Sequence, residues 1–113
     1  VVHRFWSLQD SGDYARLAPL FADDAVFSDL IYGDFHGGAA IAAYLGQMKS
    51  EMPAHGIRFE LVDAAGDETV AWSQWWCHFP TGRVPGWTLH TLGDGKLTLD
   101  ADYFDTAAAR SLS

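Results

Sequence analysis

The change of hydrophobic period after Pro53 and Gly56 is the feature of this sequence that most constrains its fold. Before these residues, apolar side chains recur at the three- and four-residue spacing of helices. After them, four strand-like runs follow, GIRFELVDA, TVAWSQWWCHF, GWTLHTL and KLTLDADYF, and the turn signals AAGDE, PTGRVP and GDGK separate these runs. Helices followed by an antiparallel meander are typical of an α+β fold, in which the helices cover one face of a curved sheet.

Three helices are predicted ahead of these strands. Residues 1–10 and 38–51 carry apolar residues at helical spacing, and residues 13–22 do so over a shorter stretch that Asp13 can cap and Pro19 shortens or kinks. The segment AVFSDLIYGDFHG predicts a short strand and then a glycine-rich loop. Because 113 residues without a repeat or a low-complexity linker suffice for one core, we expect residues 1–113 to form one domain.

Composition narrows the classes of partner. Hydrophobic residues make up 49% and aromatic residues 14%, so apolar surface is available to line a cavity as well as a core. Fifteen Asp and Glu against seven Lys and Arg give a formal charge of −8, which repels phosphate backbones and anionic lipid. We therefore expect neither nucleic acid nor a membrane as a partner, and no apolar run reaches the roughly 20 residues that span a bilayer. The single cysteine, Cys77, fits a reducing compartment, so we expect a cytoplasmic protein.

The strand predicted over residues 70–79 carries apolar side chains on both faces. By alternation, one face comprises Val70, Trp72, Gln74, Trp76 and His78, and the other comprises Ala71, Ser73, Trp75, Cys77 and Phe79. Such a strand is expected at the centre of the sheet, with helices on one face and a second subunit on the other. We expect the Trp72 face to line a pocket, and a homodimer to form through the outer face.

Acidic residues interrupt the last strand-like run. Thr98, Asp100, Asp102 and Phe104 share a face by alternation, so Asp102 faces either water or a pocket. The alternative is that Asp100, Asp102 and Asp105 are solvated acids of an acidic protein. For Asp29, near SDLIYGD, the alternative is a capping or turn role.

Three parts of the sequence are similar to a known superfamily: SGDYARLAPLFADDAVFSD, the glycine near position 37 with the helix after it, and GDGKLTLDADYFD. Over nearly its whole length the chain resembles the nuclear transport factor 2-like superfamily, which includes ketosteroid isomerases, limonene epoxide hydrolases and SnoaL-like polyketide cyclases. The resemblance implies a cystatin-like α+β barrel, a cone-shaped curved antiparallel sheet wrapped by three N-terminal helices.

The resemblance gives two carboxylates a possible role in catalysis. Asp102 lies six residues after Lys96, where limonene epoxide hydrolases carry a catalytic Asp and where SnoaL-like cyclases carry an acid. Asp29 follows FADDA at the spacing of the general base of ketosteroid isomerases. The resemblance therefore implies that one or both acids handle a proton.

Other positions depart from the motifs of these enzymes. Epoxide hydrolases pair their last-strand Asp with an Arg and a second Asp on the strand that corresponds to residues 70–79, where this sequence has Trp72, Gln74 and Trp76. The Tyr and Asn that position water in those enzymes align here with Phe27 and Asp29. The first-helix Tyr of ketosteroid isomerases is Phe5 here, and their oxyanion-stabilising Asp falls near Thr88 or Leu89. A cyclase-like site needs only one positioned acid, a polar partner and an apolar pocket, and these remain.

Physical chemistry supports Asp102 as the proton carrier. Aromatic walls, for which we expect Trp72, Trp76 and Trp87, remove water from a carboxylate and raise its pKa, and a nearby Asp29 raises it further. His78 and His90 are candidate donors to a developing oxyanion, and we rank His78 first because it shares the Trp72 face. Tyr32, Gln74 and Phe5 complete the predicted binding residues.

We therefore expect cofactor-free acid/base catalysis, a cyclisation or isomerisation of a lipophilic small molecule, with Asp102 moving the proton and Asp29, His78 and Tyr32 orienting or polarising the substrate. The alternatives are epoxide opening and a domain that binds a ligand without chemistry. No H-x-H, H-x-x-x-H or H-E-x-x-H spacing occurs, so we expect no metal site and no cofactor. Cys77 is interpreted as a buried small hydrophobe.

Overall fold

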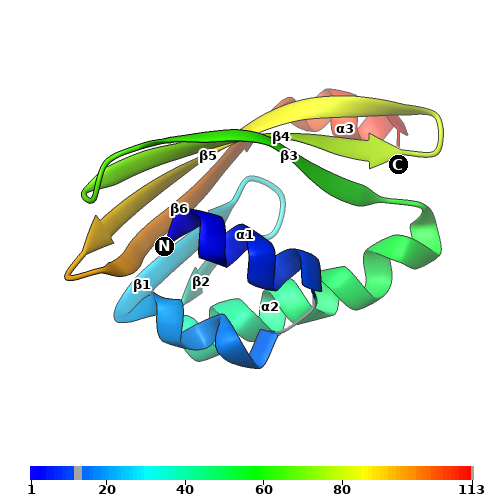
Figure 1. The fold of residues 1–113 in the computed structure, drawn as a ribbon. Helices are drawn as coiled ribbons and strands as arrows, with labels where there is room; N and C mark the ends of the chain where they lie inside the picture. Colours follow the sequence, from blue (N-terminus) through cyan, green and yellow to red (C-terminus); the bar gives the residue numbers. More distant parts are fainter. Residues whose placement is uncertain (12–13, 113) are drawn as a thin grey trace.

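A curved sheet of six strands arches over two of the α-helices (Figure 1). The computed structural model of the protein describes residues 1–11 and 14–112. The α-helices are α1 (Val2–Ser11), α2 (Gly38–Glu51) and α3 (Thr106–Leu112). The strands are β1 (Phe21–Asp29), β2 (Gly33–His36), β3 (Arg58–Gly66), β4 (Val70–Phe79), β5 (Gly82–Gly93) and β6 (Lys96–Phe104).

The sheet is mixed and open. Its strand order is β2-β1-β6-β5-β4-β3, so β2 and β3 form the two edges. The predicted meander of four antiparallel strands is confirmed as β3 to β6. The pairing of β1 with β6 is parallel, however, and it joins the first and last strands of the chain. The α+β class is thus confirmed, whereas a wholly antiparallel, closed barrel is not.

The second predicted helix is wrong. The region of residues 13–22 contains two short 3₁₀ turns, η1 (Tyr14–Arg16) and η2 (Ala18–Leu20), and β1 begins at Phe21. Pro19 lies inside η2 and has no N–H to continue a helix, which leaves the chain free to extend. The predicted cap, Asp13, lies outside the described residues. The third α-helix is instead α3, at the C-terminal end of the chain.

The two long helices close the concave side of the sheet. Helix α1 buries Val2, Phe5, Trp6 and Leu8, and helix α2 buries Ile41, Ala42 and Leu45. A third 3₁₀ turn, η3 (Met52–His55), follows α2 and leads into β3. Gly38 starts α2 against the turn before β1, where an added Cβ would overlap the carbonyl oxygen of Ala18. Glycine at this position therefore allows α2 to lie close under the sheet.

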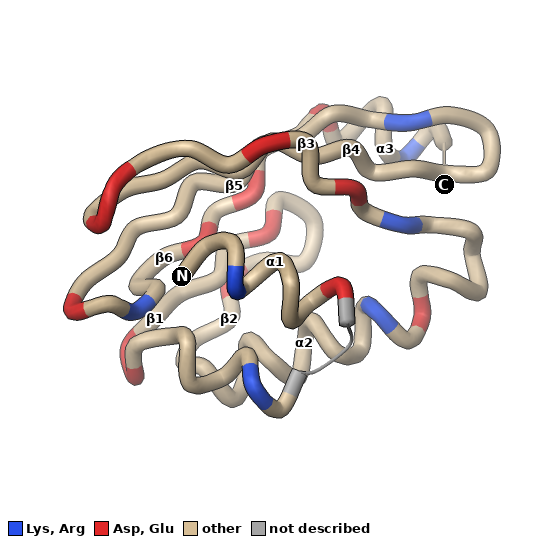
Figure 2. Tube along the Cα trace, in the orientation of Figure 1, with Lys and Arg blue, Asp and Glu red and all other residues tan. Residues whose placement is uncertain are grey.

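Charge and hydropathy set further limits. Asp and Glu residues outnumber Lys and Arg residues along the described trace (Figure 2). Among the described helices, none has the length and apolar character needed to cross a membrane.

Candidate active site

A one-residue bulge in β6 determines which acids face the concave side of the sheet. Leu92 pairs with Leu97 and Thr91 pairs with Leu99, so Thr98 has no cross-strand partner. The Thr98 hydroxyl lies 2.6 Å from the hydroxyl of Thr91. Beyond this bulge, Asp102 lies opposite Thr88 and Asp100 lies opposite His90, on the concave face. Both acids therefore lie on the face that the helices cover, where Asp100 is fully buried and Asp102 is half-buried.

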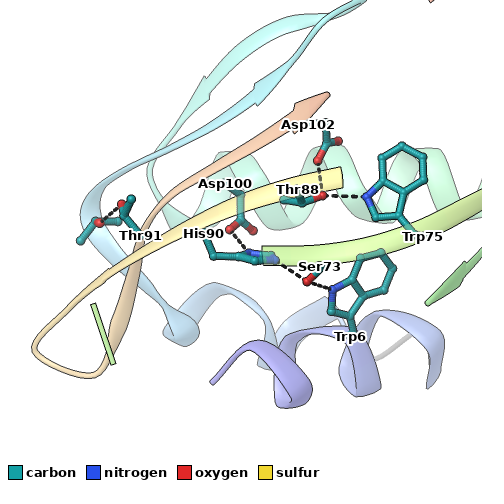
Figure 3. Close-up of polar contacts among 9 residues, drawn as sticks. Trp6, Ser73, Trp75, Thr88, His90, Thr91, Asp100 and Asp102 are labelled. Carbon is teal, nitrogen blue, oxygen red and sulfur yellow. Dashed lines mark hydrogen bonds and ion pairs between the residues drawn. The ribbon is translucent and has the colours of Figure 1, made fainter. Parts of the chain in front are cut away.

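Asp102 is held by a short chain of hydrogen bonds from two neighbouring strands (Figure 3). The hydroxyl of Thr88 donates to Asp102 Oδ1 over 2.7 Å and accepts a hydrogen bond from the indole Nε1 of Trp75 over 2.8 Å. An indole N–H can only donate, so the single hydroxyl proton of Thr88 is directed to Asp102. Oδ1 is consequently an acceptor, and any proton that Asp102 carries is expected on Oδ2.

Gly86 makes room for this arrangement. It pairs with Trp75 across the β4–β5 ladder, and an added Cβ would overlap the six-membered ring of Trp75. Because glycine has no side chain, the buried indole can lie across β5 with its N–H toward Thr88. Two residues of the GWT segment, residues 86–88, therefore position Trp75: Gly86 leaves space for the indole ring, and the Thr88 hydroxyl accepts the hydrogen bond from the indole N–H.

Asp102 and Asp29 line the same apolar cavity of about 260 Å³, which lies between α2, α3 and the sheet. Its walls are mainly hydrophobic and aromatic, and include Trp75 and Phe59. A smaller cavity of about 70 Å³ shares both acids and is also lined by Phe5, Tyr44 and Thr88. A small-molecule site of this kind combines apolar walls with a few polar groups.

A larger, open groove of about 860 Å³ lies at the turns of the β3–β4 and β5–β6 hairpins. Neither Asp29 nor Asp102 lines it, and the carboxylate of its Asp67 already accepts hydrogen bonds from Thr69 and Val70. These bonds lower the pKa of Asp67 to about 2. The carboxylate of Asp67 is thus committed to a turn, and the cavity that contains Asp29 and Asp102 is the better candidate for chemistry.

The environment of Asp102 favours the protonated acid. Burial raises its pKa to about 8, the hydrogen bond from Thr88 opposes this rise, and the charges of Asp100 and Asp29 add to it. Desolvation is thus the main cause. At neutral pH, Asp102 is a carboxylic acid that readily exchanges its proton, which is the state that acid/base catalysis near pH 7 requires.

Asp29 both stabilises a turn and lines the cavity, whereas the sequence had presented these two roles as alternatives. Its Oδ1 accepts hydrogen bonds from the backbone N–H groups of Ile31 and Tyr32, at 2.8 and 2.9 Å, and fixes the turn between β1 and β2. It also lines both cavities that contain Asp102. Asp29 is therefore held rigidly at the cavity wall.

Tyr44 on α2 is a residue of the site that sequence analysis missed, because it was interpreted only as part of the apolar helix face. Burial raises the pKa of its phenol, as do the charges of Asp29 and Asp102 and a hydrogen bond to Asp29. Phe35 stacks on its ring with centroids 4.0 Å apart. Tyr44 is thus a neutral, well-packed phenol at the smaller cavity. The only hint in the sequence was its hydroxyl group, which stands among the apolar side chains of that helix face.

A second chain of hydrogen bonds lies deeper under α1 (Figure 3). Trp6 Nε1 donates to Ser73 Oγ over 2.9 Å, Ser73 Oγ lies 2.6 Å from His90 Nε2, and His90 Nδ1 lies 2.5 Å from Asp100 Oδ1. Ser73, His90 and Asp100 are each 0% exposed. Asp100 is thus not a solvated acid, and His90 points inward, but neither lines a cavity that contains Asp102.

The predicted tryptophan walls are wrong. The helices cover the face of Ala71, Ser73, Trp75 and Cys77, which are all buried. The opposite face of the sheet carries the predicted pocket residues Trp72, Gln74, Trp76, His78 and Trp87. Trp72 and Trp87 remain 48% and 43% exposed. The alternation itself was predicted correctly, but aromatic residues on both faces gave no signal for which face meets the helices.

On that outer face, His78 and Trp76 contact charged side chains of the neighbouring strands. His78 Nε2 lies 2.8 Å from Glu60 Oε1, and the guanidinium of Arg83 lies 3.8 Å from the ring centroid of Trp76. Of the other predicted binding residues, Phe5 is buried and lines the smaller cavity, whereas Tyr32 lies at the rim of the larger one and is 59% exposed. His78 therefore does not reach the candidate site.

Metal and thiol chemistry have little support in this region. The described residues contain no cluster of three or more His, Cys, Asp or Glu side chains that could hold a metal ion. Cys77 lines the larger cavity, and burial raises the pKa of its thiol to about 11. A thiol with this pKa is almost wholly protonated at neutral pH and is a poor nucleophile.

The comparisons with known proteins agree with this geometry at the level of the family. A family model described as the SnoaL-like domain matches residues 2–99. The chain belongs to the SnoaL-like family. No curated protein matches it significantly.

Solved structures show the same fold at low sequence identity. Bal32a, from a soil-derived mobile gene cassette, is 21% identical, with a TM-score of 0.80 over 98% of this chain and 92% of Bal32a. A protein of Xanthomonas campestris proposed to be a polyketide cyclase is 18% identical, with a TM-score of 0.79 over 98% and 92%. An epoxide hydrolase of M. tuberculosis, like limonene epoxide hydrolase, is 22% identical, with a TM-score of 0.72 over 98% and 85%. At these identities, the similarity establishes the fold of this SnoaL-like domain and not its reaction.

Proposed function

We propose that this SnoaL-like domain is an enzyme that catalyses cofactor-free proton transfer, a cyclisation or an isomerisation, on a neutral lipophilic molecule. One observation carries the proposal: the carboxyl group of Asp102 lies on the wall of an apolar cavity with Oδ1 fixed by Thr88. Burial at this place raises the pKa of Asp102 to about 8. An acid with a pKa close to the working pH can both give up and take back a proton.

The size and polarity of the cavity suggest the class of substrate. An engineered apolar cavity of about 150 Å³ binds benzene. The larger cavity, about 260 Å³, offers room for a molecule of one or two rings. Most of its lining is apolar and offers an ionised substrate little compensation for lost hydration, which favours a neutral substrate. A neutral ketone with acidic C–H bonds fits both restrictions.

Each residue then has a defined role. The fraction of Asp102 that is ionised, roughly a tenth at pH 7 for a pKa of about 8, removes a proton from the carbon next to the carbonyl. Oδ2 receives this proton, because Oδ1 is occupied by Thr88. The Tyr44 phenol donates its only proton to Asp29 and so fixes that carboxylate at the wall of the smaller cavity, which also contains Asp102. Asp102 then returns the proton to a second atom of the substrate, which completes an isomerisation. In a cyclisation, the enolate carbon instead attacks a second carbonyl carbon of the same substrate, and the oxygen of that carbonyl takes the proton from Asp102.

The test begins without a substrate. Carboxyl-carbon NMR, with Asp102→Asn to assign the signal, should show Asp102 titrating near pH 8, and a value near the ordinary 3.9 would contradict the proposal. Deuterium uptake from solvent into small cyclic ketones should then depend on Asp102. We expect Asp102→Asn to lower the exchange rate by about 10²- to 10⁴-fold. Asp105→Asn is the matched control, because Asp105 caps the following helix outside the cavity.

Epoxide opening is the second candidate, favoured by the protonated state of Asp102. An acid on Oδ2 can protonate an epoxide oxygen while water or an internal hydroxyl attacks carbon. With cyclic epoxides in ¹⁸O-labelled water, label in the product would indicate attack by water, and ring closure without label would indicate cyclisation. Ligand uptake without exchange, label or product would instead indicate a domain that binds without chemistry.

We also propose that a second copy of the chain covers the outer face of the sheet. The exposed aromatic residues Trp72, Trp87 and Tyr103 lie on adjacent strands, and Trp87 pairs with Tyr103 across β5 and β6. These large apolar side chains are 48%, 43% and 47% exposed, which is unfavourable on a surface that stays in water. A symmetric dimer would bury the same patch on both subunits.

A further inference from the structure

The buried chain from Trp6 to Asp100 has one arrangement of protons in which every donor is used. Trp6 Nε1 can only donate, so Ser73 Oγ accepts from it and is left with one hydroxyl proton. Ser73 directs that proton to His90 Nε2, which must then be an unprotonated acceptor. The remaining ring proton of His90 lies on Nδ1 and is donated to Asp100 Oδ1. In this arrangement, His90 is neutral and Asp100 is an anion.

Other arrangements leave the hydroxyl proton of Ser73 without an acceptor. If His90 carried a proton on Nε2, Ser73 Oγ would accept from both Trp6 and His90, and its own hydroxyl proton would have no acceptor within this chain of residues. Burial raises the pKa of Asp100 overall, and its Oδ2 is buried without a hydrogen-bond partner, whereas the hydrogen bond between Oδ1 and His90 acts in the opposite direction. The anionic form of Asp100 therefore depends on the proton that His90 donates. Helix α1 contributes to the chain on two sides, because Trp6 bonds Ser73 and the Phe5 ring meets the His90 ring with centroids 6.0 Å apart.

Asp100 and Asp102 are neighbours on one face of β6. They are two residues apart, and their partners His90 and Thr88 are likewise two apart on β5. Residues two apart on a strand lie roughly 7 Å from each other on the same side. Asp100 is fully enclosed by protein, so its charge is poorly screened by water at that distance. A proton that leaves Asp102 must create a second negative charge beside the first.

We propose that Asp100 is a positioning residue, which Trp6, Ser73 and His90 hold as a buried anion so that the proton stays on Asp102. The inference rests on the proposed role of Asp102 as proton carrier. It adds that Ser73, His90 and Asp100, which line neither cavity that contains Asp102, increase the proton affinity that burial already gives to Asp102. Helix α1 thereby acts on the site through a chain of hydrogen bonds.

The other groups that face Asp102 come from every element around the cavities. The titratable and charged residues among those that line the two cavities are Asp29 on β1, Tyr32 in the turn after β1, Tyr44 and Lys49 on α2, Cys77 on β4, and Arg110 on α3. Asp29 also carries a charge that raises the pKa of Asp102. Asp29 lies on β1, which pairs with β6, and it lines the cavity, whereas Asp100 is fully buried and lines neither cavity that contains Asp102. The effect of Asp100 is therefore expected with or without a ligand.

The first measurement uses the unaltered protein. Nitrogen-15 NMR of His90 should show a protonated Nδ1 and an unprotonated Nε2 at neutral pH. A doubly protonated ring would overturn the proposal, because the positive charge of His90 would cancel the charge of Asp100. A proton on Nε2 alone would also overturn it, because Asp100 would then be the neutral partner that donates to Nδ1.

The second measurement is the titration of Asp102 in Asp100→Asn. We expect the pKa of Asp102 to fall by about one to two units when the neighbouring charge is removed. Asp94→Asn is the control: it removes the same charge from the β5–β6 turn, where Asn tolerates the positive φ of 52°. An unchanged Asp102 pKa in Asp100→Asn, or an equal fall in Asp94→Asn, would overturn the inference.

These outcomes separate the two proposals. If Asp102 of the unaltered protein titrates near its ordinary value, the proposed function fails, whatever His90 shows. If Asp102 titrates near pH 8 and Asp100→Asn leaves that value in place, only the inference about Asp100 fails. Should Asp100→Asn not fold, the His90 tautomer still decides, because that measurement needs no variant.

Discussion

Replacing Thr88 by Val is the sharpest test of how the candidate site is built. The two side chains have nearly the same shape, so the change removes the hydroxyl and little else. Thr88 is 3% exposed and makes two hydrogen bonds, one to Asp102 Oδ1 and one from Trp75 Nε1. The variant therefore has two separate effects, one on the acid and one on stability.

The effect on the acid follows from which form the hydroxyl favours. A hydrogen bond to a charged acceptor contributes about 1.5–3 kcal/mol, against about 0.5–1.5 for a neutral one. The ionised form of Asp102 therefore loses about 1 to 1.5 kcal/mol more than the acid does, which corresponds to a rise of about one pKa unit. We expect Asp102 in Thr88→Val to titrate about one unit above the value of about 8 in the unaltered protein.

The effect on stability comes from Trp75. Its indole N–H stays buried and loses its acceptor, which costs about 1–3 kcal/mol in the free energy of unfolding. Thr88→Ser is the matched control, since it keeps the hydroxyl and should preserve the Asp102 titration. Carboxyl-carbon NMR follows the acid, and urea unfolding below pH 6 follows stability. The reasoning would be refuted if the pKa of Asp102 stayed constant or fell in Thr88→Val, or if Ser and Val gave the same pKa.

Three further predictions concern other parts of the molecule. Gly86→Ala should displace the Trp75 indole, lower the unfolding free energy by more than 1 kcal/mol, and change the Trp75 N–H signal in NMR, because an added Cβ overlaps the ring. Because the pKa of Asp102 is raised in the folded state, the contribution of Asp102 to stability is complete below about pH 4 and is lost as the pH rises to about 8. The Asp102→Asn variant should therefore lose less unfolding free energy between pH 5 and 8 than the unaltered protein. Parallel curves of unfolding free energy against pH, measured in urea, would contradict this. Replacing Trp72 and Trp87 together by Ser should convert a dimer to a monomer in sedimentation velocity, while Tyr32→Ser should not, and a monomeric unaltered protein would refute the proposed interface.

Much of the fold could be predicted because its signals are local. Helices α1 and α2 and the strands of the meander each carry their own periodicity and turn residues. Strand β1 was harder, because Pro19 and the acidic pair Asp23–Asp24 interrupt the pattern and its partner β6 lies at the other end of the sequence. A parallel pairing between distant strands is set by the whole chain, and no short window of sequence contains it.

The placement of the acids depends on a feature that counting residues cannot supply. Gly93 pairs with Lys96 and Leu92 with Leu97, and the same register continued without a bulge would place Thr88 opposite Ala101 and His90 opposite Leu99. Opposed residues share a face, so both acids would then lie on the outer side of the sheet. The bulge at Thr98 moves the register by one residue and brings Asp100 and Asp102 beside His90 and Thr88. The resemblance singled out Asp102 from its distance to Lys96, but the partners of Asp102 follow from the register. The chemistry of the site therefore depends as much on one unpaired residue as on the carboxylates.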